Sequence, residues 1–110
     1  MTEQESTTYK LPGAVVELHR SSGSNHYYAF VALDGRYPEE GQIAHNVGRR
    51  ETLHWLEGEA HLILNGTTQF LTGRKRVAMN DGDSYILEGK GRAIVFVKDQ
   101  PGGQTQINET

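Results

Sequence analysis

The feature that most constrains the fold of this chain is a short segment that occurs twice. Residues 56–66 read LEGEAHLILNG and residues 87–97 read LEGKGRAIVFV, so a Leu-Glu-Gly step precedes an apolar strand in both places. Glycine tolerates backbone conformations that other residues resist, and it therefore suits a sharp change of chain direction. We expect Gly58 and Gly89 to form turns, each joining a strand to a successor that pairs back on it.

Short runs of strand-forming residues, separated by turn sequences, make up most of the chain. The predicted strands are 14–19, 26–33, 51–56, 61–64, 69–71, 84–87 and 92–98. Asn65-Gly66 is the strongest turn signal, because a two-residue type I′ turn needs positive φ at both central positions; it predicts a hairpin between 61–64 and 67–71. Strands this short, with turns every 8 to 12 residues or so, indicate an all-β sandwich or barrel.

The length of the chain fits one domain. Its 110 residues are close to the commonest size for a compact unit with its own core. We expect one domain over residues 1–110 with a core at about 14–100. The polar segments 1–8 and 101–110 are expected to fray or to lie over a neighbour as arms.

Composition argues against several classes of partner. The net charge is -3 and no basic face is evident, so nucleic acid is not an expected partner. The chain has no cysteine, which rules out disulfides and thiolate metal sites. The first ten residues are polar, and nowhere do about 18 apolar residues run together. We therefore expect no membrane partner and a cytoplasmic protein.

Two segments resemble the small cupins. ETLHWLEGEAHLILNG at 51–66 and NDGDSYILEGKG at 80–91 are similar to the two motifs of that family, with Glu51 and Gly58 at the family's spacing and Gly82-Asp83 opening the second motif. The resemblance implies a cupin-type double-stranded β-helix, the RmlC-like jelly-roll barrel, in a single domain.

The same resemblance implies a degenerate metal site. Small cupins place three histidines and one glutamate around a metal, but here His45 and Glu51 alone match, because the other positions hold Val47 and Arg92 or Ala93. A tight transition-metal site needs about three protein ligands. We therefore expect no tightly bound cofactor, while a divalent transition metal held by His45 and Glu51 stays possible.

Glu51 has two interpretations. Arg49, Arg50 or Arg92 could neutralise it, since a buried acid without a partner is costly. Alternatively, Glu51 and His45 could lie in the barrel mouth as acid–base groups facing a small ligand. The second interpretation makes His45 and Glu51 the candidate catalytic residues.

Four further residues are candidates for ligand binding. Strand alternation places Trp55 on the face of Glu51, where its ring could stack on a flat ligand. His26 and Tyr28 share a face that could line the same space, although Tyr27 is equally well placed on the other face. Arg92 could hold a carboxylate or phosphate in place of a metal.

These observations favour a protein that binds a small molecule, such as a sugar or an anionic metabolite, without a tight metal. The first alternative is a cupin enzyme of isomerase, epimerase or lyase type that uses His45 and Glu51, with or without a metal. The second is a non-catalytic interaction or sensor protein. The sequence does not decide whether the protein is an enzyme. Open sheet edges and the apolar run in LPGAVVELHR at 11–20 lead us to expect a homodimer.

Overall fold

The computed structural model describes residues 4–21 and 23–110 of the chain, and they form an all-β barrel. The all-β prediction is confirmed. Among these residues no helix is long and apolar enough to cross a membrane. The strands are β1 (Gln4–Leu11), β2 (Ala14–Ser21), β3 (His26–Tyr37), β4 (Gln42–Leu64), β5 (Thr67–Thr72), β6 (Lys75–Met79) and β7 (Ser84–Glu109).

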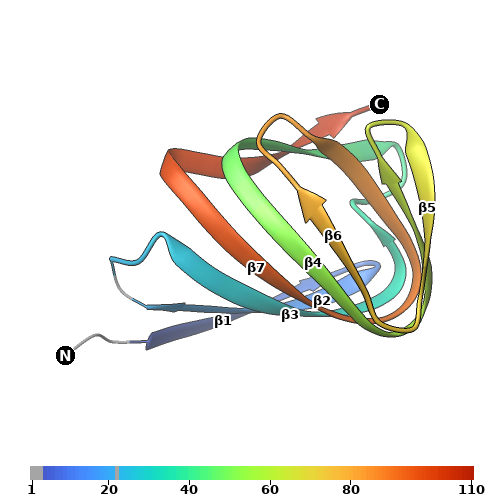
Figure 1. Cartoon of the computed structure of the whole chain (residues 1–110), viewed down its shortest axis with the longest axis horizontal. Coiled ribbons are helices and arrows are strands. Elements are labelled where there is room, and N and C mark those ends of the chain that lie inside the picture. The colour runs from blue at the N-terminus through green and yellow to red at the C-terminus, as the bar shows by residue number, and fades with distance from the viewer. Residues whose placement is uncertain (1–3, 22) are drawn as a thin grey trace.

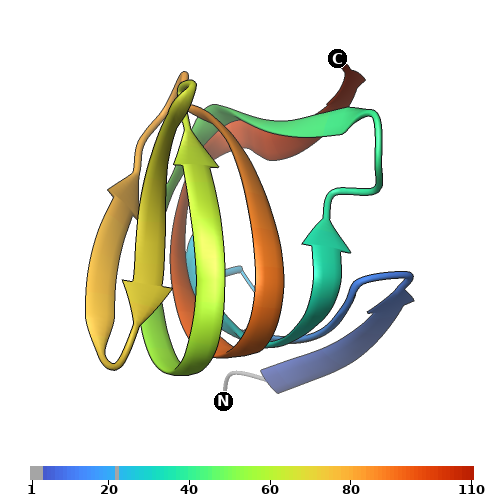
Figure 2. The same cartoon turned by 90° about the vertical axis from the view of Figure 1, so that its right-hand side faces the viewer.

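All strands belong to one antiparallel sheet that curls on itself. The hydrogen-bonded order is β1-β2-β3-β7-β4-β5, and β6 pairs with β4. Figure 1 shows β1, β2 and β3 along one side of the barrel, with the C-terminal part of β7 passing over the opposite side. In the perpendicular view, the β4–β5 hairpin and β6 form one wall (Figure 2).

The repeated Leu-Glu-Gly segments are corners inside two long strands, and the prediction that each ends a strand is wrong. Strand β4 has 23 residues and β7 has 26, and each continues through its glycine. Gly58 has φ 90° and Gly89 has φ 149°. The corners lie side by side, because Gly58 pairs with Gly91 and Ala60 with Gly89. Glycine permits the bend, but the ladder does not stop there.

Close backbone approach explains why glycine stands at these corners. A Cβ at Gly58 would lie 2.2 Å from the carbonyl oxygen of Lys90. A Cβ at Gly91 would lie 2.1 Å from the carbonyl oxygen of Glu57 and 2.4 Å from a ring carbon of Trp55. The indole of Trp55 thus packs under the corner, where a side chain at residue 91 would otherwise stand.

The predicted hairpin is confirmed. Asn65 has φ 50° and Gly66 has φ 82°, as a type I′ turn requires, and Leu64 pairs with Thr67 across it. Most of the described residues near the two chain ends belong to the sheet. Strand β1 pairs with β2, and residues 104–109 of β7 pair with 42–47 of β4.

Side-chain alternation separates an apolar interior from an outer face that carries several aromatic rings. Inward positions include Leu53, Leu62 and Leu71, which are almost fully buried. On the outside, Phe30 and Phe96 remain 42% and 49% exposed. This outer aromatic face, defined by His19, Tyr28, Phe30, His54 and Phe96, crosses strands β2, β3, β7 and β4.

Candidate functional site in the barrel

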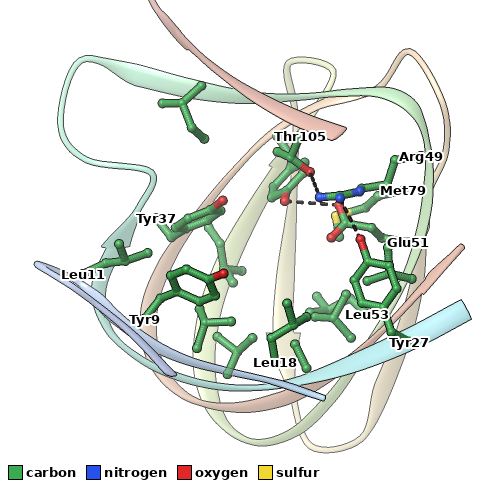
Figure 3. Close-up of a pocket in the computed structure, with 18 of the residues that line it drawn as sticks. Tyr9, Leu11, Leu18, Tyr27, Tyr37, Arg49, Glu51, Leu53, Met79 and Thr105 are labelled. Atoms are coloured by element: carbon green, nitrogen blue, oxygen red, sulfur yellow. Dashed lines mark hydrogen bonds between the residues drawn. The ribbon is translucent and has the colours of Figure 1, made fainter. Parts of the chain in front are cut away.

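The barrel encloses a cavity of about 510 Å³ that is apolar along most of its wall and polar at one end. Aliphatic side chains of β2, β3, β4 and β7 form the wall. Figure 3 shows the polar end, where Tyr27, Arg49, Glu51 and Thr105 meet. The lining side chains are Tyr9, Leu11, Val16, Leu18, Arg20, Tyr27, Ala29, Val31, Tyr37, Arg49, Glu51, Leu53, Leu62, Met79, Tyr85, Leu87, Val95, Val97, Thr105 and Ile107.

An ion pair anchors this polar end. The Nε atom of Arg49 donates to Oδ1 of Asp99 at 2.8 Å, and a terminal nitrogen donates to Oδ2 at 3.1 Å. The Tyr27 hydroxyl donates to Oδ2 of Asp99 at 2.6 Å. Although burial acts to raise it, the hydrogen bonds from Arg49 and Tyr27 hold the pKa of Asp99 below its ordinary value. Asp99 is therefore a carboxylate that matches the guanidinium charge.

The C-terminal part of β7 fixes the other side of the guanidinium. The second terminal nitrogen of Arg49 donates to the Thr105 hydroxyl at 2.9 Å, and that hydroxyl donates to the side-chain oxygen of Asn46 at 2.9 Å. Asn46 is fully buried. Strands β3, β4 and β7 are thus tied together at one point on the cavity wall.

Glu51 is a buried acid beside this cluster. Its exposed fraction is 8%, and the Tyr85 hydroxyl donates to its Oε1 at 3.2 Å. Burial raises the pKa of Glu51, while a hydrogen bond from Asn46 and the nearby charge of Arg49 oppose that rise. Among the described side chains, no basic group forms an ion pair with Glu51. A carboxyl that is costly to ionise thus faces the cavity.

Replacing Glu51 with glutamine should stabilise the protein at neutral pH. A carboxyl whose pKa is higher in the folded than in the unfolded state stabilises the fold below the ordinary pKa of glutamate. This stabilisation is lost as the pH rises through the pKa of the folded state. We expect the free energy of unfolding of Glu51→Gln to exceed that of wild type by about 1 kcal/mol near pH 8 and to differ little from it near pH 4. Urea unfolding at both pH values measures the difference, with the exposed Glu57→Gln as the control. A gain of equal size at both pH values would contradict a charge effect.

The structure does not bring His45 and Glu51 together. His45 does not line the cavity, and its Nδ1 lies 2.8 Å from the Ser84 hydroxyl. The register of β4 against β7 shifts between Val47 and Arg49. This irregularity resets the alternation of β4, so that Ala44 and Asn46 are buried on the inner side and His45 lies between them.

The four candidate ligand-binding residues also lie away from the cavity lining. Trp55 is 1% exposed, and its Nε1 donates to the carbonyl oxygen of Gly58 at 2.9 Å. The side chain of Arg92 is 73% exposed and pairs with Glu57 at 3.1 Å. His26 is exposed at the start of β3. Tyr28 stacks on His19 with a ring separation of 5.1 Å, on the outer aromatic face.

The residues present do not fit a tight metal site. In the part of the chain that the structure describes, no three His, Cys, Asp or Glu side chains converge. His45 faces Ser84, Glu51 accepts from Tyr85, and the guanidinium of Arg49 lies on the wall of the same cavity. A metal ion would meet a single carboxyl here and would lack the further protein ligands that tight binding needs.

Sequence reasoning missed most of the polar residues at this end of the cavity. Asp99 carried a usable signal, because alternation from the apolar Val95 and Val97 places it on the inner face. The sequence makes Arg49 a candidate partner for Glu51, but its hydrogen bonds go to Asp99, Tyr27 and Thr105. Tyr85 follows Gly82-Asp83 in the second motif and gave no separate signal.

Comparison with known proteins gives structural similarity alone. No protein-family model and no curated protein sequence matches the chain. The structure is similar to Pac13, a nucleoside dehydratase from Streptomyces, with a TM-score of 0.78 and 12% identity over 96% of this chain and 88% of that one. It also resembles a salicylate 1,2-dioxygenase from Pseudoaminobacter salicylatoxidans, with a TM-score of 0.70 and 18% identity over 92% of this chain and 30% of that one.

Proposed function

We propose that this protein, which has the jelly-roll fold of a small cupin, binds a small organic molecule inside its barrel. The apolar body of the ligand would lie along the aliphatic wall, and one polar group would reach Glu51 and Tyr85. One observation carries the proposal: a cavity of about 510 Å³ contains a carboxyl that is 8% exposed and has no basic partner among the described residues. Apolar pockets with a few convergent polar groups are the usual form of such sites.

The two structural neighbours support a compact cyclic ligand. The dehydratase was solved with uridine and the dioxygenase with gentisate, and both molecules combine a ring with polar substituents. A sugar-like group would suit the hydroxyls of Tyr37 and Tyr85. The anionic-metabolite alternative depended on Arg92, whose side chain stands outside the cavity and pairs with Glu57.

Filling the cavity should abolish binding. Ala29 lines the cavity from β3, so Ala29→Phe places a ring inside it. Ala78 on β6 is exposed, and Ala78→Phe is the matched control. We expect a library of cyclic compounds that includes uridine and gentisate to contain ligands that raise the melting temperature of wild type. The same ligands should leave Ala29→Phe unchanged, because binding to the native state is what stabilises it.

Two results would contradict the binding proposal. The first is that no compound in the library shifts the melting temperature of wild type. The second is that the shift persists in Ala29→Phe, which would place the site elsewhere. Binding in wild type and Ala78→Phe, with loss in Ala29→Phe, supports the barrel.

An enzyme is the second candidate, because both neighbours are enzymes and Glu51 has a raised pKa at the cavity wall. Glu51 and Tyr85 would exchange a proton with the ligand, as an isomerase, epimerase or lyase requires. His45 would take no direct part, since it lies outside the cavity lining. Turnover of a bound compound that Glu51→Gln loses while still binding it would favour the enzyme over a sensor.

We also propose that the protein forms a homodimer through the outer aromatic face. One cross-strand row on this face begins at Glu17, passes Phe30, Ile94 and His54, and ends at Arg76. A two-fold copy would bring the acidic end of this row to the basic end of its partner. The exposed rings of Phe30 and Phe96 would lose contact with water in that arrangement.

The dimer proposal predicts that a charge on the face separates the copies. We expect Phe96→Glu to sediment as a monomer at tens of micromolar protein and wild type as a dimer. Phe70→Glu is the control, because Phe70 is 47% exposed on β5 and lies outside the face. A wild-type monomer, or equal dissociation of both variants, would disprove this interface.

A further inference from the structure

The charges at the polar end of the cavity leave one carboxyl without a counterion. All three nitrogens of Arg49 donate hydrogen bonds, to Asp99, Tyr27 and Thr105. Both oxygens of Asp99 accept from this guanidinium, so the two charges cancel within the pair. Arg49 is therefore committed to Asp99 and does not serve as the ion-pair partner of Glu51.

Glu51 faces the cavity with acceptor capacity to spare. Its carboxyl accepts from the Tyr85 hydroxyl and from Asn46, and no salt bridge reaches it from the described part of the chain. In Figure 3, the hydroxyls of Tyr9 and Tyr37 point toward the interior from the side opposite Glu51. A phenol oxygen can accept a hydrogen bond as well as donate one. The Glu51 carboxyl and these phenol oxygens can therefore all accept hydrogen bonds from a ligand.

We infer that the ligand of this site carries a protonated nitrogen, as an amine, an amidine or a cationic heterocycle does, and that this nitrogen pairs with the Glu51 carboxylate. The inference rests on the proposed function and names the head group of the same ligand. The cation would supply the missing counterion, and its remaining N–H groups would donate to the tyrosine oxygens. Its apolar body would lie against Leu53, Leu62 and Val95.

An anionic head group suits the same site poorly. It would lie beside the carboxyl of Glu51 and near Asp99, and like charges at close range in a partly dry cavity repel strongly. The remaining arginine of the lining, Arg20, is exposed, and its guanidinium lies 4.9 Å from the centre of the Tyr27 ring. A charge that stays in water is screened and contributes little to holding an anion deep in the barrel.

Matched ligands test the inference. Tryptamine, tryptophol and indole-3-propionate share an aromatic body and carry an amine, an alcohol and a carboxylate, and phenyl and naphthyl sets with the same three head groups widen the choice of body. Calorimetric titration should show the amine binding at least about tenfold more tightly than the alcohol, with the acid weakest, because a buried charge pair contributes that much or more. Equal affinities within every set would overturn the cationic head group and leave the binding proposal intact. An absence of binding by every compound would overturn both.

Glu51→Gln supplies the second test, because it keeps the size and removes the charge. It should weaken amine binding by about tenfold or more, leave the alcohol within about twofold, and strengthen the acid. Glu57→Gln, at a surface carboxyl outside the cavity, should change none of these affinities. If Glu51→Gln bound the amine more tightly or the acid more weakly than wild type does, the proposed charge of the head group would be wrong.

A third measurement uses wild-type protein and so does not depend on the variant folding. In protein labelled with ¹³C at the glutamate carboxyls, the Glu51 signal, assigned by its loss in Glu51→Gln or by through-bond correlation, should titrate at lower pH when the amine is bound. A cation beside a carboxyl favours its ionised form. An unchanged titration of Glu51 in the presence of saturating amine would show that the nitrogen does not pair with it.

Discussion

Gly58→Ala should lower the free energy of unfolding by about 3 to 5 kcal/mol relative to wild type, one of the largest losses that the addition of a single methyl group to this chain can cause. The new Cβ would stand 2.2 Å from the carbonyl oxygen of Lys90 and 2.6 Å from the Cα of Gly91, both of which are backbone atoms. Two paired strands would have to separate locally, and the positive φ adds its own strain. Thermal or urea unfolding measures the loss.

Gly82 provides a matched control for this effect. Gly58 and Gly82 both have φ near +90°, but a Cβ at Gly82 meets nothing within 4 Å. Gly82→Ala should therefore cost only the backbone strain, about 1 kcal/mol. If the two variants lost equal stability, steric contact between the corners would not be the reason for glycine at residue 58, and conformation alone would explain it.

Arg49→Met should lower the free energy of unfolding by about 3 kcal/mol at neutral pH, because it leaves the Asp99 carboxylate buried without its partner. The side chains of Arg49 and Asp99 are 20% and 10% exposed. The pKa of Asp99 is depressed in the folded state, so its contribution is present above the ordinary pKa of aspartate and is lost as pH falls. The deficit of Arg49→Met should therefore shrink below about pH 4.

A double-mutant cycle distinguishes the ion pair from simple loss of packing. The double variant Arg49→Met, Asp99→Leu removes both charges, and its stability should recover much of what Arg49→Met loses, since no unpaired charge remains. Additive losses in the double variant, or a deficit in Arg49→Met that does not depend on pH, would contradict the role given to the pair. Urea unfolding of the four proteins at neutral and acidic pH completes the measurement.

Much of the fold could be predicted from the sequence, because its signals are local. Asn65-Gly66 specifies its hairpin through two φ angles, and strand alternation correctly placed Leu53 and Trp55 on the face of Glu51. The two Leu-Glu-Gly segments were recognised as bends. Whether each strand stops or continues at its bend could not be predicted from the segments themselves. A glycine that ends a strand and a glycine that bends a continuing strand have the same local sequence.

The candidate site was harder to predict, because it depends on which side chains of each strand face inward and on how distant strands pair. Counting back by twos from Glu51 places His45 on the inner face, and only the register shift near Val47 reverses this. Tyr27 and Tyr28 are adjacent aromatic residues, so alternation alone could not say which one faces inward. Asp99 reaches Arg49 only once β7 lies beside β4, and that pairing leaves no trace in either segment alone.

The pairing of β4 with β7 also bears on how the chain reaches this structure. Leu64 pairs with Tyr85 at one end of the ladder and Gln42 pairs with Glu109 at the other. Apart from the added pairs of Ala44 with Tyr85 and His45 with Ser84, the paired residues are nested like those of a single long hairpin. The entropy lost in closing a loop grows only slowly with its length. After Leu64 and Tyr85 have met, each further pair encloses only a few more residues. Most of the entropy cost of pairing these distant strands therefore arises when Leu64 and Tyr85 first come together, beside the Asn65-Gly66 turn.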